Sequence, residues 1–330
     1  MLYKDNLEEI IFQRHNLLLS DELIVLSGYV GPSPVSRLEE LPIRSSVIYG
    51  MYGSDGIDPI LHQSLTDLQG RIAKVNIFYS LLPVHSKAYV WRNRGDVVHA
   101  LVGSANFSNN GLRTPYREIL AETSIDTFRP LNEYVQHVLN NSQSCLEIAN
   151  LVPLRRRPNL VVSAGDVCLM TLLDPRTGEV QNVSGLNWGQ NLQNPKQKPN
   201  DASIPIRSEY IRAYPELFPP KQNYSKDPRG KAQRQNDAIE MIWDDEVTME
   251  GLLEGNYPIG NVMFPKQISS FPHKSQLGEY FRNRLGVPSG QPVRRHHLEA
   301  YGRTDVGVSL IAEGVYRFDF SVNKLSNVIS

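Results

Sequence analysis

The chain has 330 residues, of which 21% are charged, and its 34 basic and 35 acidic side chains leave a formal net charge of -1. This length exceeds a typical single domain and predicts two domains of ordinary size. The composition excludes a disordered or collagen-like chain and disfavours an all-basic, histone-like binder, while local basic patches remain compatible with nucleic-acid binding.

Two cysteines, Cys145 and Cys168, are too few for a disulfide framework or a thiolate zinc site, which indicates a reducing compartment. The N-terminus is charged early and lacks an apolar core, and no run of about 18 apolar residues follows. The sequence therefore predicts neither a signal peptide nor a membrane span. We expect a soluble, cytoplasmic protein that does not bind membranes.

The first half of the chain alternates apolar runs of strand length with stretches at helical spacing. In chain order, the patterns predict a helix at 6–18, a strand at 22–30, a helix at 34–41, a strand at 45–52, a helix at 57–68, a strand at 73–80, a hairpin at 85–106, a strand at 117–124 and a helix at 128–148. Strands separated by helices of this length predict a mainly parallel sheet with helices on both faces.

The hairpin at 85–106 carries the most informative side chains. Asn and Gly in its turn tolerate the dihedral angles of a tight reversal. Because side chains alternate along a strand, His85 and Lys87 share one face, and Ser104 and Asn106 share a face of the return strand. A neutral imidazole can attack phosphorus, while ammonium and amide N–H groups can hold phosphate oxygens.

The pattern H-x-K followed by G-S-x-N resembles the catalytic signature of the phospholipase D superfamily. The resemblance implies an α/β sheet domain in which His85 is the nucleophile and Glu118, with Glu122 as second choice, orients it. Two features depart from the family pattern. Arg92 stands where the family usually has an Asp whose role is mainly structural, and the separation between Lys87 and Gly103 is four residues longer than usual. A lone strand histidine is commonly structural and G-S-A-N is a common turn, but both motifs in order on adjacent strands are much more specific.

The sequence contains no second H-x-K with a G-S-x-N partner. The mechanism implied by the resemblance needs two histidines, one to form a phosphohistidine and one to protonate the leaving oxygen. We therefore expect a homodimer through the N-terminal domain, in which His85 faces its own copy.

The second half begins after an Arg-Arg-Arg-Pro run, which is either a solvated linker or a phosphate-contacting or autoinhibitory segment. The expected limits are 1–153 for the nuclease-type domain, 154–165 for the linker and 166–330 for the second domain. The second domain is predicted to be a β-rich barrel with one or two helices. Its expected elements are strands at 167–173, 239–243 and 314–322, a turn at 174–179 and a helix at 277–285.

Polar stretches of the second domain are rich in Asn, Gln, Arg and Lys, which read base edges or contact phosphates. Ordinary hydrophilic loops have a similar composition, yet a separate domain joined to a phosphodiesterase favours DNA recognition. The candidate DNA-binding residues are Trp188, Gln190, Asn191, Arg207, Arg234, Gln235, Asn236, Lys274 and Gln276.

The two-part layout, with S-G-L-N-W-G-Q and D-A-S-I-P-I in the second half, resembles restriction endonucleases of the NgoFVII/NgoAVII type, which share their plan with BfiI. The resemblance implies a plant B3-like pseudobarrel and a dimeric, metal-independent endonuclease that cuts double-stranded DNA at a specific short site without a cofactor. Some members work with a separate ATP-dependent helicase-like subunit, and this chain has no G-x-x-x-x-G-K-[ST] loop of its own.

Two other classes stay open: a superfamily phosphodiesterase that acts on RNA or another phosphodiester, and a DNA-binding protein with an inactive nuclease fold. The intact motif side chains argue against the inactive fold, and the lack of an amphipathic basic helix or apolar anchor argues against a lipid substrate. A magnesium nuclease is disfavoured because Asp174-Pro175 with Glu179 is in reverse order for a P-D…(D/E)-x-K site.

Overall fold

The computed structural model describes residues 1–114, 117–154, 167–191, 196–221 and 236–322. These residues divide into two compact units. The first takes in the described part of Met1–Ala164 together with Ala238–Ile242 and Leu310–Tyr316, and the second takes in the described remainder. From residue 155 on, the predicted linker lies outside the described residues, so the domain limits 1–153 and 166–330 stay a prediction.

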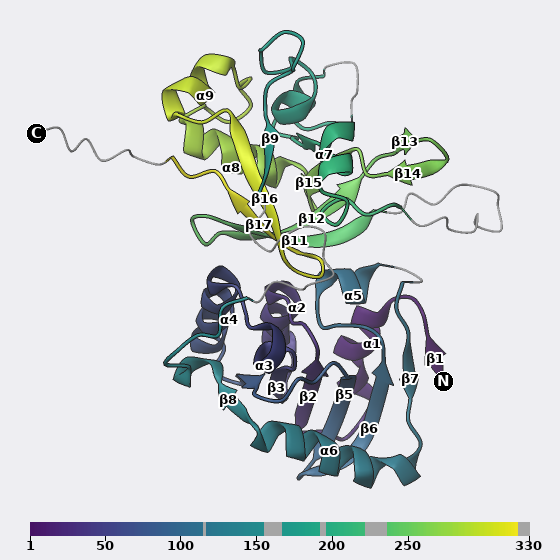
Figure 1. The fold of residues 1–330 in the computed structure, drawn as a ribbon. Coiled ribbons are helices and arrows are strands. Elements are labelled where there is room, and N and C mark those ends of the chain that lie inside the picture. Colours follow the sequence, from purple (N-terminus) through teal and green to yellow (C-terminus); the bar gives the residue numbers. More distant parts are fainter. Residues whose placement is uncertain (115–116, 155–166, 192–195, 222–235, 323–330) are drawn as a thin grey trace, which may run out of the picture. The chain divides into compact units, whose positions relative to one another are not determined.

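The first unit is built on an eight-stranded sheet in the order β1-β7-β6-β5-β2-β3-β4-β8 (Figure 1). Its elements are β1 Leu2–Tyr3, α1 Leu7–Gln13, η1 Arg14–Leu17, β2 Glu22–Ser27, α2 Pro32–Arg37, η2 Leu38–Glu40, β3 Arg44–Tyr49, α3 Tyr52–Asp55, α4 Pro59–Arg71, β4 Val75–Ser80, β5 Lys87–Asn93, β6 Asp96–Gly103, α5 Asn109–Arg113, β7 Leu120–Glu122, η3 Ile125–Thr127, α6 Phe128–Asn140, β8 Ser142–Ser144 and η4 Cys145–Glu147. The α/β class expected for this half is confirmed.

The strand directions differ from the prediction. The pairs β2–β3 and β3–β4 are parallel, but β5 is antiparallel to both β2 and β6, and the outer pairs β1–β7, β6–β7 and β4–β8 are antiparallel as well. The prediction of a mainly parallel sheet is therefore wrong, since the helix-connected strands account only for β2, β3 and β4. The hairpin prediction is confirmed: Arg94 and Gly95, with φ of 53° and 90°, form the two-residue turn between β5 and β6.

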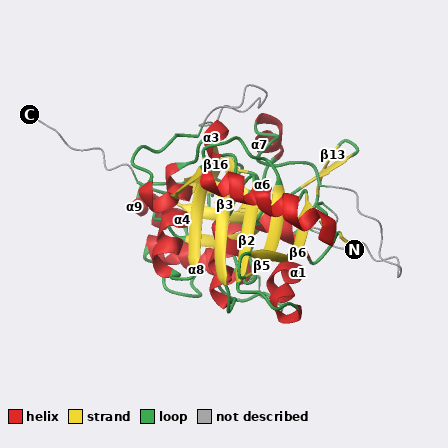
Figure 2. Cartoon of the chain, turned by 90° about the horizontal axis from the view of Figure 1, so that it is seen from below, coloured by secondary structure: helices red, strands yellow, loops and turns green. Residues whose placement is uncertain are grey.

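Helices cover both faces of this sheet. Alternation along β2 sends Leu23 and Val25 into one apolar cluster, shared with α1, α2 and α4, and sends Ile24 and Leu26 into a second cluster on the opposite face. The second cluster includes Val135 of α6, and Figure 2 shows α6 running across the strands. The fully apolar run of β2 is thus explained by burial on both faces.

The second unit contains most of a seven-stranded sheet in the order β10-β15-β12-β11-β17-β16-β9, with a separate hairpin β13–β14. The elements of the second half of the chain are β9 Cys168–Thr171, η5 Gly185–Gln190, β10 Ile204–Pro205, α7 Ser208–Ala213, β11 Asp237–Trp243, β12 Thr248–Glu254, β13 Tyr257–Ile259, β14 Val262–Phe264, β15 Gln267–Ser270, α8 Ser275–Leu285, α9 Arg295–Tyr301, β16 Asp305–Ala312 and β17 Val315–Asp319, and the first unit includes most of β11, the end of β16 and the start of β17. The prediction of a β-rich, barrel-like second half is confirmed, and the predicted strands correspond to β9, β11 and β17.

Three predicted features can be compared directly with the structure, namely the helix at 128–148, the strand that bears Glu118 and the turn at 174–179. Helix α6 ends at Asn140 and β8 follows, so the predicted helix at 128–148 is too long. Glu118 precedes the short strand β7 and does not lie within it. The predicted turn at 174–179 is confirmed by backbone hydrogen bonds between its ends. Within the ranges that the structure describes, no helix has both the length and the apolar character to cross a bilayer.

Candidate functional site

Three polar side chains of the first unit converge over one glycine. His85 precedes β5, Lys87 begins it, Asn106 follows β6, and Gly28 follows β2. A methyl group on the Cα of Gly28 would lie 3.0 Å from Cδ2 of His85, 3.3 Å from Oδ1 of Asn106 and 3.3 Å from Nζ of Lys87. The imidazole, carboxamide and ammonium expected from the two motifs are therefore neighbours in space.

The ammonium group of Lys87 favours a neutral His85. Its Nζ lies 3.1 Å from each ring nitrogen of His85 and donates a hydrogen bond to the His85 carbonyl oxygen at 2.6 Å. Burial, followed by the charge of Lys87, lowers the pKa of His85, while Glu313 and Asp55 partly oppose the shift. Burial also lowers the pKa of Lys87 itself. A neutral imidazole beside a buried cation is suited to act as a nucleophile.

The carboxamide of Asn106 is held in one orientation. Its Oδ1 accepts the backbone N–H of Tyr29 at 3.2 Å and the hydroxyl of Ser27 at 3.4 Å. Nδ2 therefore forms the opposite end of the amide, and it donates to the carboxylate of Glu313 at 3.3 Å. The side chain is buried, so these bonds fix which end of the amide faces a ligand.

Ser104 and Glu118 form a second pair beside the converging groups. The hydroxyl of Ser104 donates to the carboxylate of Glu118, and it accepts the backbone N–H of Ile119 at 3.2 Å. Burial raises the pKa of Glu118 despite this hydrogen bond. Among the described residues, the hydrogen bond of the Glu118 side chain runs to Ser104, so its role in orienting His85 stays a prediction.

Two further carboxylates near His85 were not foreseen from the sequence. Glu313, in the segment Leu310–Tyr316 of the first unit, accepts from Asn106 and pairs with Arg117 at 3.1 Å. Asp55 accepts the hydroxyl of Tyr29 at 2.5 Å, and the Tyr29 ring packs edge-on against the imidazole of His85. Both carboxylates come from segments remote in sequence, and neither lies in a recognisable motif. The donors Asn106 and Arg117 thus already hold an anionic group.

The two departures from the superfamily motif have a structural explanation. Arg92 is buried on β5, directly opposite Glu22 of β2, and the two side chains form an ion pair at 3.6 Å. Lys87 pairs with Gly103 at the open end of the hairpin. Extra residues near the turn, at the other end of the hairpin, lengthen both strands and leave Lys87 opposite Gly103. The altered spacing is therefore compatible with an intact set of side chains.

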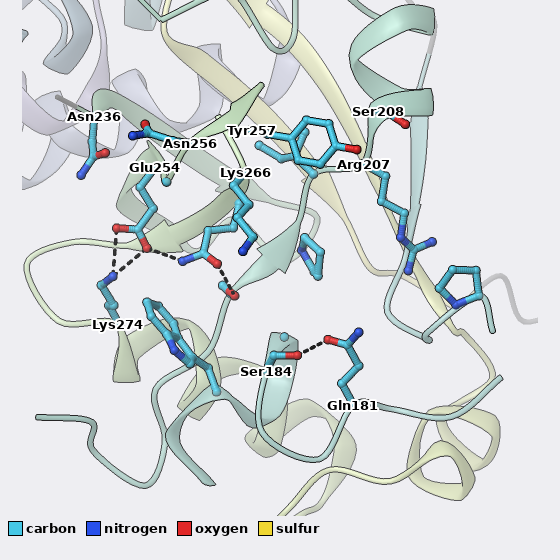
Figure 3. Close-up of a pocket in the computed structure, with 18 of the residues that line it drawn as sticks. Gln181, Ser184, Arg207, Ser208, Asn236, Glu254, Asn256, Tyr257, Lys266 and Lys274 are labelled. Atoms are coloured by element: carbon cyan, nitrogen blue, oxygen red, sulfur yellow. Dashed lines mark hydrogen bonds and ion pairs between the residues drawn. The ribbon is translucent and has the colours of Figure 1, made fainter. Parts of the chain in front are cut away.

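A cleft of about 1080 Å³ opens in the second unit (Figure 3). Its lining comes from residues 175–188, which lead into and include part of η5, and from residues 203–209 around β10. The end of β12, the start of β13, the start of β15 and Lys274, which precedes α8, complete most of the rest. Among the described lining residues, five side chains are basic and two are acidic. They are Arg176, Arg207, Lys221, Lys266 and Lys274, with Glu209 and Glu254. The cleft is therefore suited to a polyanion.

Four of the predicted DNA-binding residues line this cleft: Trp188, Arg207, Asn236 and Lys274. Gln190, Asn191 and Gln276 do not line it, and Arg234 and Gln235 lie outside the described residues. The amide nitrogen of Gln190 donates to the carbonyl oxygens of Pro199 and Gly290, so this residue holds loops together.

Several lining residues were missed by the sequence analysis. Glu254 and Gln267 sit opposite each other at the ends of β12 and β15, and Lys221 donates to the carbonyl oxygen of Gly255 at 2.8 Å. Isolated polar residues at strand ends carry no motif, and only the folded sheet brings them together.

Comparisons with known proteins agree with both halves of this description. Residues 5–152 match the model of the NgoFVII restriction endonuclease N-terminal PLD domain, and residues 164–312 match that of the NgoFVII C-terminal B3-like DNA-binding domain. No curated protein sequence matches the chain. The two family matches confirm the resemblance and the fold class expected from the sequence.

Solved structures similar to this chain include NucT from Helicobacter pylori, at 18% identity, 42% coverage of this chain, 87% coverage of that chain and a TM-score of 0.31. A phospholipase D family member, Nuc from Salmonella typhimurium, has 10% identity, the same two coverages and a TM-score of 0.28. Phosphatidylserine synthase from Haemophilus influenzae has 11% identity, covers 42% of this chain and 35% of its own, and has a TM-score of 0.28.

Proposed function

Because this chain belongs to the NgoFVII restriction endonuclease family, we propose that it is an endonuclease that cuts DNA phosphodiester bonds at a specific short sequence. The observation that carries the chemical part is the convergence of His85, Lys87 and Asn106 over Gly28. These groups supply a nucleophile and donors for phosphate oxygens. Nδ2 of Asn106 already donates to the carboxylate of Glu313, so this donor is able to serve an anionic oxygen.

The proposed reaction has two steps at one phosphorus atom. A ring nitrogen of His85 attacks the scissile phosphate, so that a P–N bond forms while the P–O bond to the leaving sugar breaks. Lys87 and Asn106 hold the non-bridging oxygens as charge develops, and Ser104 joins them when its hydroxyl turns from Glu118 to the phosphate. A second histidine gives its proton to the leaving oxygen, then takes a proton from water, which attacks phosphorus and breaks the P–N bond.

The second histidine has to come from another copy of the chain, because the sequence holds one H-x-K motif. We propose a homodimer through the N-terminal unit in which two copies of His85 face one phosphate. The protein groups themselves provide the nucleophile, the acid and the positive charge, so the proposed mechanism uses no metal ion. Glu118 is proposed to orient His85, and a separate ATP-dependent helicase-like subunit stays a prediction.

The cleft of the second unit is the proposed DNA-recognition site. Exposed Arg176 and Lys266 and partly exposed Arg207 supply positive charge for phosphates. Trp188 and Asn236, predicted from sequence as DNA-binding residues, lie in the same cleft.

The test is digestion of unmethylated plasmid and genomic DNA by purified protein in EDTA, with and without a helicase-like partner. Discrete fragments are expected from wild-type protein, and His85→Ala is expected to bind DNA without cutting it. Cleavage by well-folded His85→Ala protein would overturn the assignment of the nucleophile. Cleavage of RNA or of a simple phosphodiester, with DNA left intact, would keep the chemistry and overturn the restriction function.

A further inference from the structure

We propose that Glu254 is a positioning residue that fixes Lys274 and Gln267 as base-reading groups in the cleft of the second unit. The proposal rests on the proposed function, because it assigns the part of DNA recognition that distinguishes one sequence from another. It concerns two residues, Glu254 and Gln267, that no motif of the chain indicated.

Glu254 lies at the centre of a hydrogen-bonded network that Figure 3 shows in the cleft. Its carboxylate is almost fully buried and accepts Nζ of Lys274 at 2.7 Å and 2.9 Å on its two oxygens. Nε2 of Gln267 donates to the same carboxylate at 2.8 Å. Because Glu254 and Gln267 are direct partners in the β12–β15 pairing, the sheet itself sets their spacing.

Lys274 is held from a second side. Its Nζ lies 4.0 Å from the centre of the Trp188 ring, in the geometry of a cation–π contact. The two oxygens of Glu254 engage two of its three N–H donors, which, among the described residues, leaves one donor for a ligand. A lysine held in this way loses little freedom on binding and presents its donor at a fixed place. In the major groove, the acceptors N7 and O6 of guanine suit such a donor.

The amide of Gln267 is likewise fixed. Its nitrogen donates to Glu254, and its oxygen accepts the hydroxyl of Ser203 at 3.4 Å, so rotation of the amide by half a turn would place its oxygen against the Glu254 carboxylate. Within the part of the chain that the structure describes, one N–H and one lone pair of this amide remain for a ligand. A glutamine with one donor and one acceptor side by side matches N7 and N6 of adenine.

The charges of the network favour bases over phosphates as its ligands. A buried carboxylate repels a phosphate, whereas the Glu254–Lys274 pair as a whole carries no net charge. Arg176 and Lys266 lie exposed in the same cleft and are better placed for the DNA backbone. The cleft thus separates into cations for phosphates and a neutral, hydrogen-bonding network for base edges.

The test begins with selection of binding sites by full-length wild-type protein from randomised duplexes. Dissociation constants are then measured for the selected site and each single-base variant at several salt concentrations. For Glu254→Gln we expect discrimination at one or two purine positions to fall roughly tenfold, with the salt dependence unchanged. Lys266→Gln is the matched control: it should weaken binding to all duplexes and reduce the salt slope by about one.

Two more variants keep the test decisive if Glu254→Gln does not fold. Gln267→Met and Lys274→Met leave Glu254 in place, and each should lose discrimination at a different position. An unchanged base preference in all folded variants, or a uniform loss of affinity with a smaller salt slope, would overturn the inference. If wild-type protein selects no sequence at all, the proposed function itself fails. This result differs from the two outcomes that would overturn only the role of Glu254.

Discussion

Gly28→Ala perturbs the candidate active site without altering any of its chemical groups. The backbone at Gly28 is not in the left-handed region, so alanine can adopt its conformation. The new methyl group would stand 3.0 Å from Cδ2 of His85 and 3.3 Å from both Nζ of Lys87 and Oδ1 of Asn106. It therefore pushes on the three side chains that the proposed mechanism needs together.

The size of the effect follows from these distances. To reach an ordinary contact of 3.4 Å, the imidazole has to retreat by about 0.4 Å, and the other two groups by about 0.1 Å. A misplacement of about 1 Å costs roughly a hundredfold in rate, so a shift of this size is expected to lower the cleavage rate on the order of tenfold. The added methyl also increases the burial of His85, so its pKa should fall further.

The assay combines single-turnover cleavage with NMR titration of His85 and a thermal melt. Gly70→Ala is the matched control, because a methyl at this position of α4 meets nothing within 4 Å. That variant should cleave at the wild-type rate and gain up to about 1 kcal/mol of stability from helix propensity. If Gly28→Ala also cleaves at the wild-type rate and leaves the His85 titration unchanged, the three side chains do not form the reactive site.

Further predictions concern single electrostatic groups. Lys87→Met should raise the pKa of His85, because the ammonium charge is one cause of its lowering; NMR titration would show the midpoint move to higher pH, and a downward shift would contradict the reasoning. Glu240→Ala should destabilise the first unit by about 3 kcal/mol, since its buried carboxylate accepts backbone N–H groups at the starts of α2 and α5, at 2.8 Å and 3.0 Å. Urea unfolding measures this loss, and Glu133→Ala, in an exposed ion pair, should change stability by less than about 1 kcal/mol. Arg282→Met should lower the free energy of unfolding by about 3 kcal/mol, because it removes a buried guanidinium that donates to three backbone carbonyls. A melting temperature equal to that of the wild type would refute this role.

The hairpin and its catalytic-type side chains could be predicted because their signals are local. Asn93 and Gly95 mark the turn, and alternation places His85 and Lys87 on one face, as the short distances between their side chains bear out. Glu313 could not be predicted, because it reaches Asn106 across more than two hundred residues of sequence. Tertiary contacts of this kind leave no trace in local pattern.

The errors in the fold have similar causes. The alternation of helices and strands describes β2, β3 and β4 correctly, but it says nothing about β5, which returns beside β2 in the opposite direction. Strand β8 is three polar residues long and pairs with β4, so the sequence pattern offered no reason to end the helix at Asn140. In the cleft, the sequence gives no sign that Glu254 differs from other charged strand residues, because its partner Gln267 lies opposite it only in the folded β12–β15 pair.

The first unit is assembled from three stretches of chain, and this affects the order in which it can form during translation. Ile242, Ile311 and Val315 belong to the same apolar core as Leu23 and Val25, yet they leave the ribosome long after the His85 hairpin. A nascent chain that stops before residue 310 carries every motif of the first half with an incomplete core. We therefore expect the first unit to complete its folding only after nearly the whole polypeptide has been synthesised.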